Sequence, residues 1–132
     1  MYGNVVIRRE DVEKYGMNIL FDSKVHRIHD NSFRDNQHIE GELVIPTNIT
    51  KLGMFSFSNC KCLTKVIIPS SVKEIPYCCF EHCKQLKEVE LPKDIVLEPK
   101  CFWECPLLKE IVKEEEHGEE DKEEIKSNCS IC

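Results

Sequence analysis

Cysteine is the residue type of this chain with the most reactive side chain, and nine cysteines occur among its 132 residues. Cys79 and Cys83 form one Cys-x-x-x-Cys pair, and Cys101 and Cys105 form another. Four thiolates are a well-known ligand set for structural zinc. A cysteine-based zinc-binding or redox protein is therefore one hypothesis, although the more usual Cys-x-x-Cys spacing does not occur in residues 1–112.

The last four residues, Cys-Ser-Ile-Cys, indicate a different cysteine chemistry. They have the form C-a-a-X, in which the first cysteine, here Cys129, takes an isoprenoid through a thioether bond. A single lipid chain anchors a protein only weakly, and the acidic residues upstream of Cys129 are repelled by anionic lipids. The motif predicts lipidation of Cys129 and peripheral membrane attachment. A coincidental cysteine in a cysteine-rich chain is the alternative.

The five histidines show no comparable pattern. General acid–base catalysis needs titratable groups gathered in one pocket, and no carboxylate or nucleophile stands at a telling spacing beside any histidine. We therefore predict that the protein is not an enzyme and has no catalytic residues, no metal ion and no cofactor.

A repeat of about 23 residues organises the chain and predicts the elements that position these side chains. An apolar residue followed by proline recurs, and each proline lies 23 residues after the one before. A phenylalanine recurs at spacings of 24, 23 and 22 residues. The prolines are Pro46, Pro69 and Pro92, and the phenylalanines are Phe33, Phe57, Phe80 and Phe102.

The two halves of each repeat have different periodicities. Residues 63–68 read Leu-x-x-Val-x-Ile, whose last two apolar residues alternate as in a strand, and the proline that follows ends it. Such strands, stacked in order, predict a narrow parallel sheet. In the other half, apolar residues fall at i, i+1, i+4 and i+7 from Cys79, a spacing that predicts short helical turns on the opposite face.

The repeat also gives the cysteines a structural role. The position of Cys79 is taken by serine in the earlier repeats, so the position favours a small side chain facing the core. A free cysteine packs as a small hydrophobic residue. We favour this role over zinc binding for five cysteines: Cys60, Cys79, Cys83, Cys101 and Cys105.

The repeat resembles that of the BspA-like (Treponema-type) leucine-rich repeat family. Residues 63–83, LTKVIIPSSVKEIPYCCFEHC, follow the family's 23-residue unit L-x-x-I-x-I-P-x-x-V-x-x-I-x-x-x-A-F-x-x-C. Pattern and resemblance together predict an α/β repeat solenoid: a short leucine-rich-repeat stack of about four units, with a parallel sheet on one face and helical turns on the other. The resemblance implies a role in adhesion or protein recognition, without catalytic residues.

Charge and apolar pattern divide the chain into three parts. Residues 25–112 hold the repeats, and residues 1–24 are expected to form an N-terminal cap, with a strand at 5–7 and a helix at 11–15 that Gly16 ends. Residues 113–132 hold eight acidic residues and three lysines. A segment with so much like charge cannot bury enough apolar surface to fold alone, so we expect a disordered acidic tail.

The composition argues against several classes of function. The net charge is −6, which disfavours the phosphate contacts of a nucleic-acid-binding protein. No apolar run approaches the roughly 18 residues of a transmembrane helix, and residues 1–10 do not resemble a secretory signal. These features and the odd number of cysteines predict a cytoplasmic protein, with Cys129 offering attachment to the cytoplasmic face of a membrane.

A binding surface is expected on the strand side, where alternate side chains point outward. Four outward residues occupy equivalent positions in successive repeats, and three of them are β-branched, which suggests an exposed apolar stripe. The alternative explanation is that β-branched residues are simply good strand formers. The sequence thus predicts a protein-interaction module whose partner it does not identify. The predicted partner-binding residues are Val44, Ile67, Glu90, Val112, Lys65 and Glu88.

Overall fold

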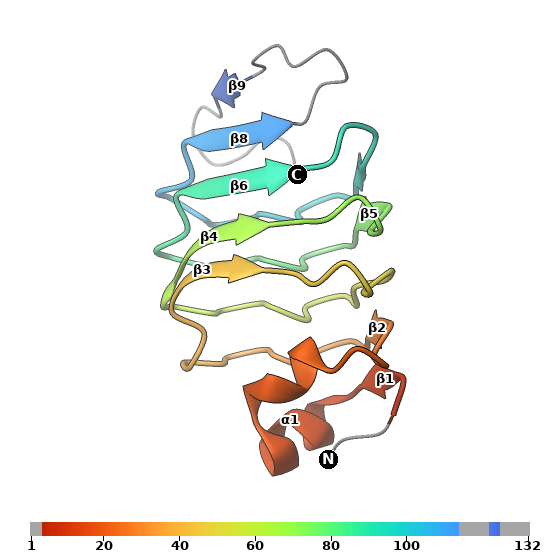
Figure 1. Cartoon of the computed structure of the whole chain (residues 1–132). Coiled ribbons are helices and arrows are strands. Elements are labelled where there is room, and N and C mark those ends of the chain that lie inside the picture. The colour runs from red at the N-terminus through yellow and green to blue at the C-terminus, as the bar shows by residue number, and fades with distance from the viewer. Residues whose placement is uncertain (1–3, 114–121, 125–132) are drawn as a thin grey trace.

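The strand half of each repeat lies on one side of a stack of coils (Figure 1). The computed structural model describes residues 4–113 and 122–124. Each strand pairs in parallel with the strand of the next coil, in the order β3-β4-β6-β8, as the repeat predicts. These strands are β3 (Gly41–Val44), β4 (Leu63–Ile67), β6 (Glu88–Leu91) and β8 (Glu110–Lys113).

Two short strand pairs form away from this sheet. One joins β1 (Val6–Ile7) to β2 (Arg27–Ile28), and the other joins β5 (Glu74–Ile75) to β7 (Val96–Leu97). Both pairs are parallel and hold their isoleucines inside the coils. Arg27 of β2 also forms a parallel bridge with Lys51 of the next coil. The coils are therefore joined along a second side as well.

The N-terminal segment lies at one end of the stack, where helix α1 (Arg9–Tyr15) leads into the 3₁₀ helix η1 (Met17–Phe21) (Figure 1). The helix ends at Gly16, whose φ of 83° is in the left-handed region that favours glycine. The Arg9 guanidinium fixes the helix to the first coil, because its Nη1 donates to the carbonyls of Asn31 (2.9 Å) and Arg34 (3.1 Å). No helix of the described residues is long and apolar enough to cross a membrane.

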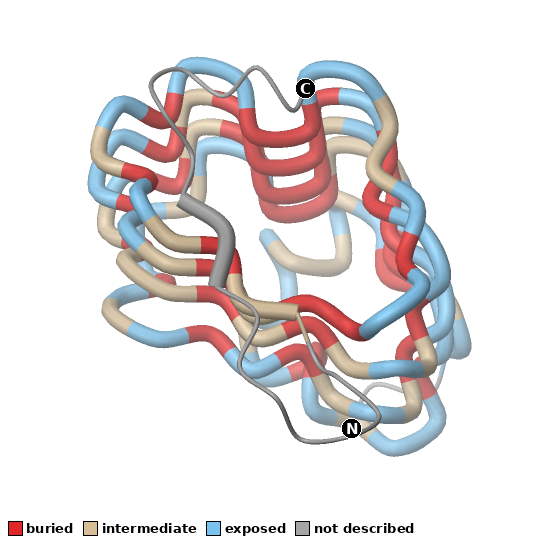
Figure 2. Tube along the Cα trace, turned by 90° about the horizontal axis from the view of Figure 1, so that it is seen from above, coloured by how far each residue is buried: buried red, intermediate tan, exposed pale blue. Residues whose placement is uncertain are grey.

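A column of four phenylalanines runs through the inside of the coils. Their side chains are fully buried, and neighbouring rings stack with centroids 5.2, 5.3 and 5.6 Å apart. Figure 2 shows buried segments recurring at the same place in successive coils. The alignment predicted from the repeat spacing is thus present: Phe33, Phe57, Phe80 and Phe102.

The turns that carry these phenylalanines are not helical, so the predicted helical turns are wrong. In an α-helix each N–H donates to the carbonyl four residues earlier. Here successive N–H groups donate alternately within their own turn and to the next coil. The N–H of Ser56 donates to Gly53 within its own turn (3.2 Å), whereas that of Phe57 donates to Cys79 in the next coil (2.9 Å). Because alternate N–H groups of the turn donate to the next coil, they are not available for the hydrogen bonds within a helix.

Each turn also contains two non-glycine residues with left-handed backbone angles, four positions apart, at φ values from 55° to 64°. This conformation costs roughly 1–2 kcal/mol per residue, which burial of the phenylalanine between the two must offset. The left-handed residues interrupt any right-handed helix and turn the chain back toward the sheet. The pairs are Asn31 and Asp35, Phe55 and Asn59, Cys78 and His82, and Lys100 and Glu104.

One strand lies inside the segment that we expected to be disordered. Strand β9 (Lys122–Glu124) pairs with β8 in the antiparallel sense and adds a fifth strand to the main sheet. A strand at the edge of a sheet offers unpaired backbone groups, and even a highly charged segment can satisfy them. The expectation of disorder is therefore wrong for these three residues. Residues 114–121 and 125–132, with Cys129, lie outside the described residues.

Candidate binding face

The parallel strands bring the predicted binding residues together in two rows. Strand pairing places Val44 beside Ile67, Ile67 beside Glu90, and Glu90 beside Val112. A second row runs parallel to the first, two residues earlier in each strand. We call the two rows the strand face: Val44, Ile67, Glu90 and Val112, with Glu42, Lys65, Glu88 and Glu110. The role of these residues in binding stays a prediction.

The apolar side chains of the strand face are accessible to solvent to different degrees. Val44 is 49% exposed, and Ile67 and Val112 are half-buried. The residues between them along each strand, such as Leu43 and Val66, are buried in the core. Because Glu90 separates Ile67 from Val112, the apolar stripe is interrupted rather than continuous.

The strand face carries four carboxylates and one ammonium group. Lys65 Nζ lies 3.4 Å from Glu88 Oε2 and 3.1 Å from Glu90 Oε2. The hydrogen bond to Glu90, with the field of both carboxylates, raises the pKa of Lys65 above its usual value. One lysine thus serves two glutamates, and Glu42 adds a further carboxylate to the row of Lys65 and Glu88. The surface is complementary to a basic ligand.

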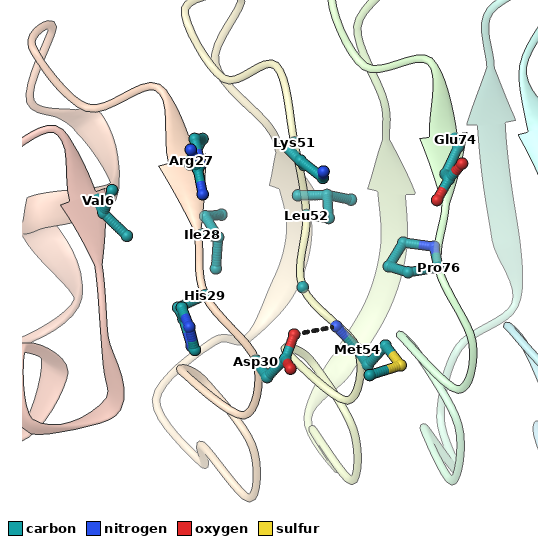
Figure 3. Close-up of a pocket in the computed structure, with 11 residues that line it drawn as sticks. Val6, Arg27, Ile28, His29, Asp30, Lys51, Leu52, Met54, Glu74 and Pro76 are labelled. Atoms are coloured by element: carbon teal, nitrogen blue, oxygen red, sulfur yellow. Dashed lines mark hydrogen bonds between the residues drawn. The ribbon is translucent and has the colours of Figure 1, made fainter.

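A pocket on another side of the coils was not predicted from the sequence (Figure 3). It has a volume of about 250 Å³ and surrounds Gly53, so we call it the Gly53 pocket. A Cβ atom at this glycine would lie 2.4 Å from the His29 carbonyl carbon, so only glycine allows the two coils to approach this closely. The available signal was a glycine at a position that other residues, His29 and Pro76, take in the neighbouring coils.

Aromatic and cationic side chains gather on the outer turns, which the sequence interpretation also missed. Two clusters form, each with one cation over an aromatic ring. Three of these residues, Phe55, His82 and Lys100, themselves have left-handed backbone angles. The first cluster is Arg34, Phe55 and Tyr77, and the second is Lys100, Trp103 and His82.

The cysteines of the repeats lie in the core. Cys60, Cys83 and Cys105 each place Sγ within 3.2–3.4 Å of the carbonyl oxygen of a phenylalanine in the preceding coil. Burial raises the pKa of Cys60 and of Cys79 to about 12. The hydrogen bond to Cys105, together with burial, also raises the pKa of Cys83. In the part of the chain that the structure describes, no three histidine, cysteine or acidic residues are grouped to hold a metal ion.

These buried thiols should react only when the protein unfolds. A thiolate is the reactive form, and the thiols of Cys60 and Cys79 stay protonated at pH 8. We expect a disulfide reagent to modify Cys62, which is half-buried, at least 100-fold faster than Cys60 or Cys79 in the native protein. Peptide mapping after timed labelling measures the difference. Equal labelling rates without denaturant would contradict the buried role.

The same pKa values predict alkaline destabilisation. In the unfolded chain these thiols ionise near pH 9, whereas in the folded protein they ionise near pH 12. The folded state therefore binds more protons between these values, and the free energy of unfolding must fall as pH rises from 9 to 12. Urea unfolding at pH 8 and pH 10 tests this. A Cys60→Ala/Cys79→Ala variant should show a weaker dependence on pH than the parent.

Stacked parallel strands, one buried phenylalanine in each coil and tight outer turns define a leucine-rich-repeat solenoid. The sequence profile described as "BspA type Leucine rich repeat region (6 copies)" matches residues 15–131. The chain therefore belongs to the BspA-type leucine-rich repeat family. This match is wider than residues 25–112, and the predicted boundaries and number of units stay predictions.

A solved structure supports the assignment of the fold. The chain is similar to a leucine-rich repeat protein from Eubacterium ventriosum, with 29% sequence identity and a TM-score of 0.58. The similarity covers 67% of this chain and 24% of that protein, so this chain spans about a quarter of its relative's length. No curated protein matches the chain.

Proposed function

We propose that the protein is a non-enzymatic interaction module that binds a basic and partly apolar segment of a protein partner on the strand face. Membership of the leucine-rich repeat family supports a protein-binding role in general. The observation that carries the finer proposal is that the two rows of the strand face combine exposed Val44 with four carboxylates and one lysine.

The chemistry of the two rows favours this kind of partner. Valine and isoleucine side chains lose water when an apolar surface covers them, which stabilises a complex. Carboxylates along the neighbouring row attract lysine and arginine and exclude acidic segments. A segment with alternating basic and apolar residues matches both rows, and its binding should weaken as salt concentration rises.

The test uses a double variant of the strand face. We expect Ile67→Lys/Val112→Lys to lower affinity for each true partner at least 100-fold, because it replaces apolar contacts with charges that repel a basic segment. Val96→Lys is the matched control, since Val96 is 52% exposed in β7, away from the strand face. Partners captured by the full chain would be titrated against all three proteins. Equal affinity for the double variant, with its fold intact by circular dichroism, would rule out the strand face.

A cytoplasmic location with lipidation of Cys129 is part of the same proposal. It is supported by the Cys-Ser-Ile-Cys sequence and by the odd number of cysteines, which is typical of a reducing compartment. An isoprenoid would hold the strand face near a membrane and raise the local concentration of partners there. Mass spectrometry of protein from its native cell tests this, and an unmodified Cys129 followed by the last three residues would remove it.

A further inference from the structure

The Gly53 pocket has features of a ligand site that is separate from the strand face. Figure 3 shows its cationic side chains, Arg27 and Lys51, on one edge and Asp30 on another. The floor is backbone, because Gly53 lies directly against the peptide that joins His29 to Asp30. The pocket therefore has a polar end and a fixed base.

Arg27 and Lys51 are adjacent like charges. They pair directly across neighbouring coils, in an arrangement that is unfavourable for two cations. Within residues 4–113, neither lies in ion-pair distance of a carboxylate. An anion between the two side chains would offset their repulsion and bind to both.

The acidic residues of the pocket limit the charge of that anion. Asp30 accepts a hydrogen bond from the Met54 N–H at 2.9 Å, and Glu74 lies on the same edge as Arg27 and Lys51, on the coil that follows Lys51 (Figure 3). Two carboxylates around the rim oppose a ligand with two negative charges much more than a ligand with one. The lining therefore favours a monoanion, such as a carboxylate, over a phosphate dianion.

The rest of the lining limits the size of the ligand and offers contacts for its hydrocarbon part. Its volume of about 250 Å³ is just below the roughly 300–1,000 Å³ of most ligand pockets, so the pocket suits only a small ligand. Five apolar residues line the pocket, and the side chains of two of them, Val6 and Met54, are accessible to solvent; the other three, Ile28, Leu52 and Pro76, are buried. We propose that the Gly53 pocket binds a small organic carboxylate, with the carboxylate between Arg27 and Lys51 and the hydrocarbon part over the accessible side chains of Val6 and Met54.

Amide NMR of the full chain tests the proposal with butyrate, acetate and phosphate as probes at equal ionic strength. We expect butyrate to shift the amides of residues 27–30 and 51–54 in a saturable way, with tighter binding than acetate or phosphate. Arg27→Gln and Lys51→Gln should each weaken butyrate binding at least tenfold. Lys61→Gln is the control, because Lys61 is exposed and does not line the pocket.

Each other result overturns a defined part of the proposal. Shifts that do not saturate, or that are the same in Arg27→Gln and Lys51→Gln, would remove the site. Acetate binding as tightly as butyrate would remove the apolar contact. Phosphate binding most tightly would overturn the preference for a monoanion. None of these results depends on the partner of the strand face, so the two proposals are tested independently.

Discussion

Replacing Phe80 with alanine is expected to lower the free energy of unfolding by about 3–5 kcal/mol. Phe80 is fully buried and stacks on both sides, with Phe57 at 5.3 Å and Phe102 at 5.6 Å between ring centroids. Its loss removes a large apolar surface and leaves a cavity that the flanking rings cannot fill without moving both coils. The free energy of unfolding of a domain of this size is about 5–15 kcal/mol in total, so the variant would retain only part of the stability of the parent.

Urea unfolding of the parent and variant measures this effect. Phe21→Ala is the matched control, because Phe21 is 55% exposed at the end of η1 and its truncation should cost under about 1 kcal/mol. Phe80→Leu should lie between the two, because leucine fills part of the same space. If Phe80→Ala were no more destabilising than Phe21→Ala, the column would not be the centre of the core.

The second large effect is expected at Gly53, where alanine should cost about 3 kcal/mol. The added Cβ would lie 2.4 Å from the His29 carbonyl carbon and 2.5 Å from the Asp30 nitrogen. Both atoms are backbone, so no side-chain rotation relieves the overlap, and the first coil must move away from the second. The hydrogen bond from the Met54 N–H to Asp30 should weaken as a result.

Hydrogen exchange and thermal unfolding together test this prediction. We expect faster exchange at the Met54 amide and a transition temperature lower by roughly 12 °C or more. Glu98→Ala is the control, because Glu98 takes the corresponding place after Leu97 and is only half-buried. A Gly53→Ala protein as stable as Glu98→Ala would show that the coils are not in close contact at this position.

The fold was largely predictable because the repeat encodes contacts between equivalent residues. Once Phe57 and Phe80 are recognised as equivalent, stacking them requires the coils and the parallel strands between them. The outer turns were not predictable in the same way. An apolar spacing of i, i+1, i+4 and i+7 from Cys79 fits an α-helix, but it also fits a turn bounded by two left-handed residues.

Residue type gave little warning of those left-handed positions. Asn31, Asp35 and Asn59 are typical of positive φ, but the later turns place Cys78 and Lys100 there, which are not. In these turns the stacking interactions override local preference. The available signal was the asparagine and aspartate residues of the first two turns, whose positions could have been transferred to the later repeats.

The two candidate sites also differ in how far the sequence predicts them. The rows of the strand face follow from counting alternate residues in aligned strands, so Val44, Ile67 and Glu90 could be placed together from the sequence. The Gly53 pocket depends on the close approach of two coils that Gly53 allows. Periodicity describes what the repeats share, so it does not reveal a feature of a single coil.

The alternating hydrogen bonds of the outer turns give the stack an electrical polarity. At this edge each coil donates its N–H groups to the carbonyls of the next, as Asn59 donates to Glu81 and His82 to Trp103, both at 2.8 Å. The aligned peptide dipoles place partial negative charge at the N-terminal end and partial positive charge at the C-terminal end, which is opposite to an α-helix. The Arg9 guanidinium already neutralises the negative end at the Arg34 carbonyl. The opposite end should attract anions, and a run of three acidic residues follows β8 directly in the sequence.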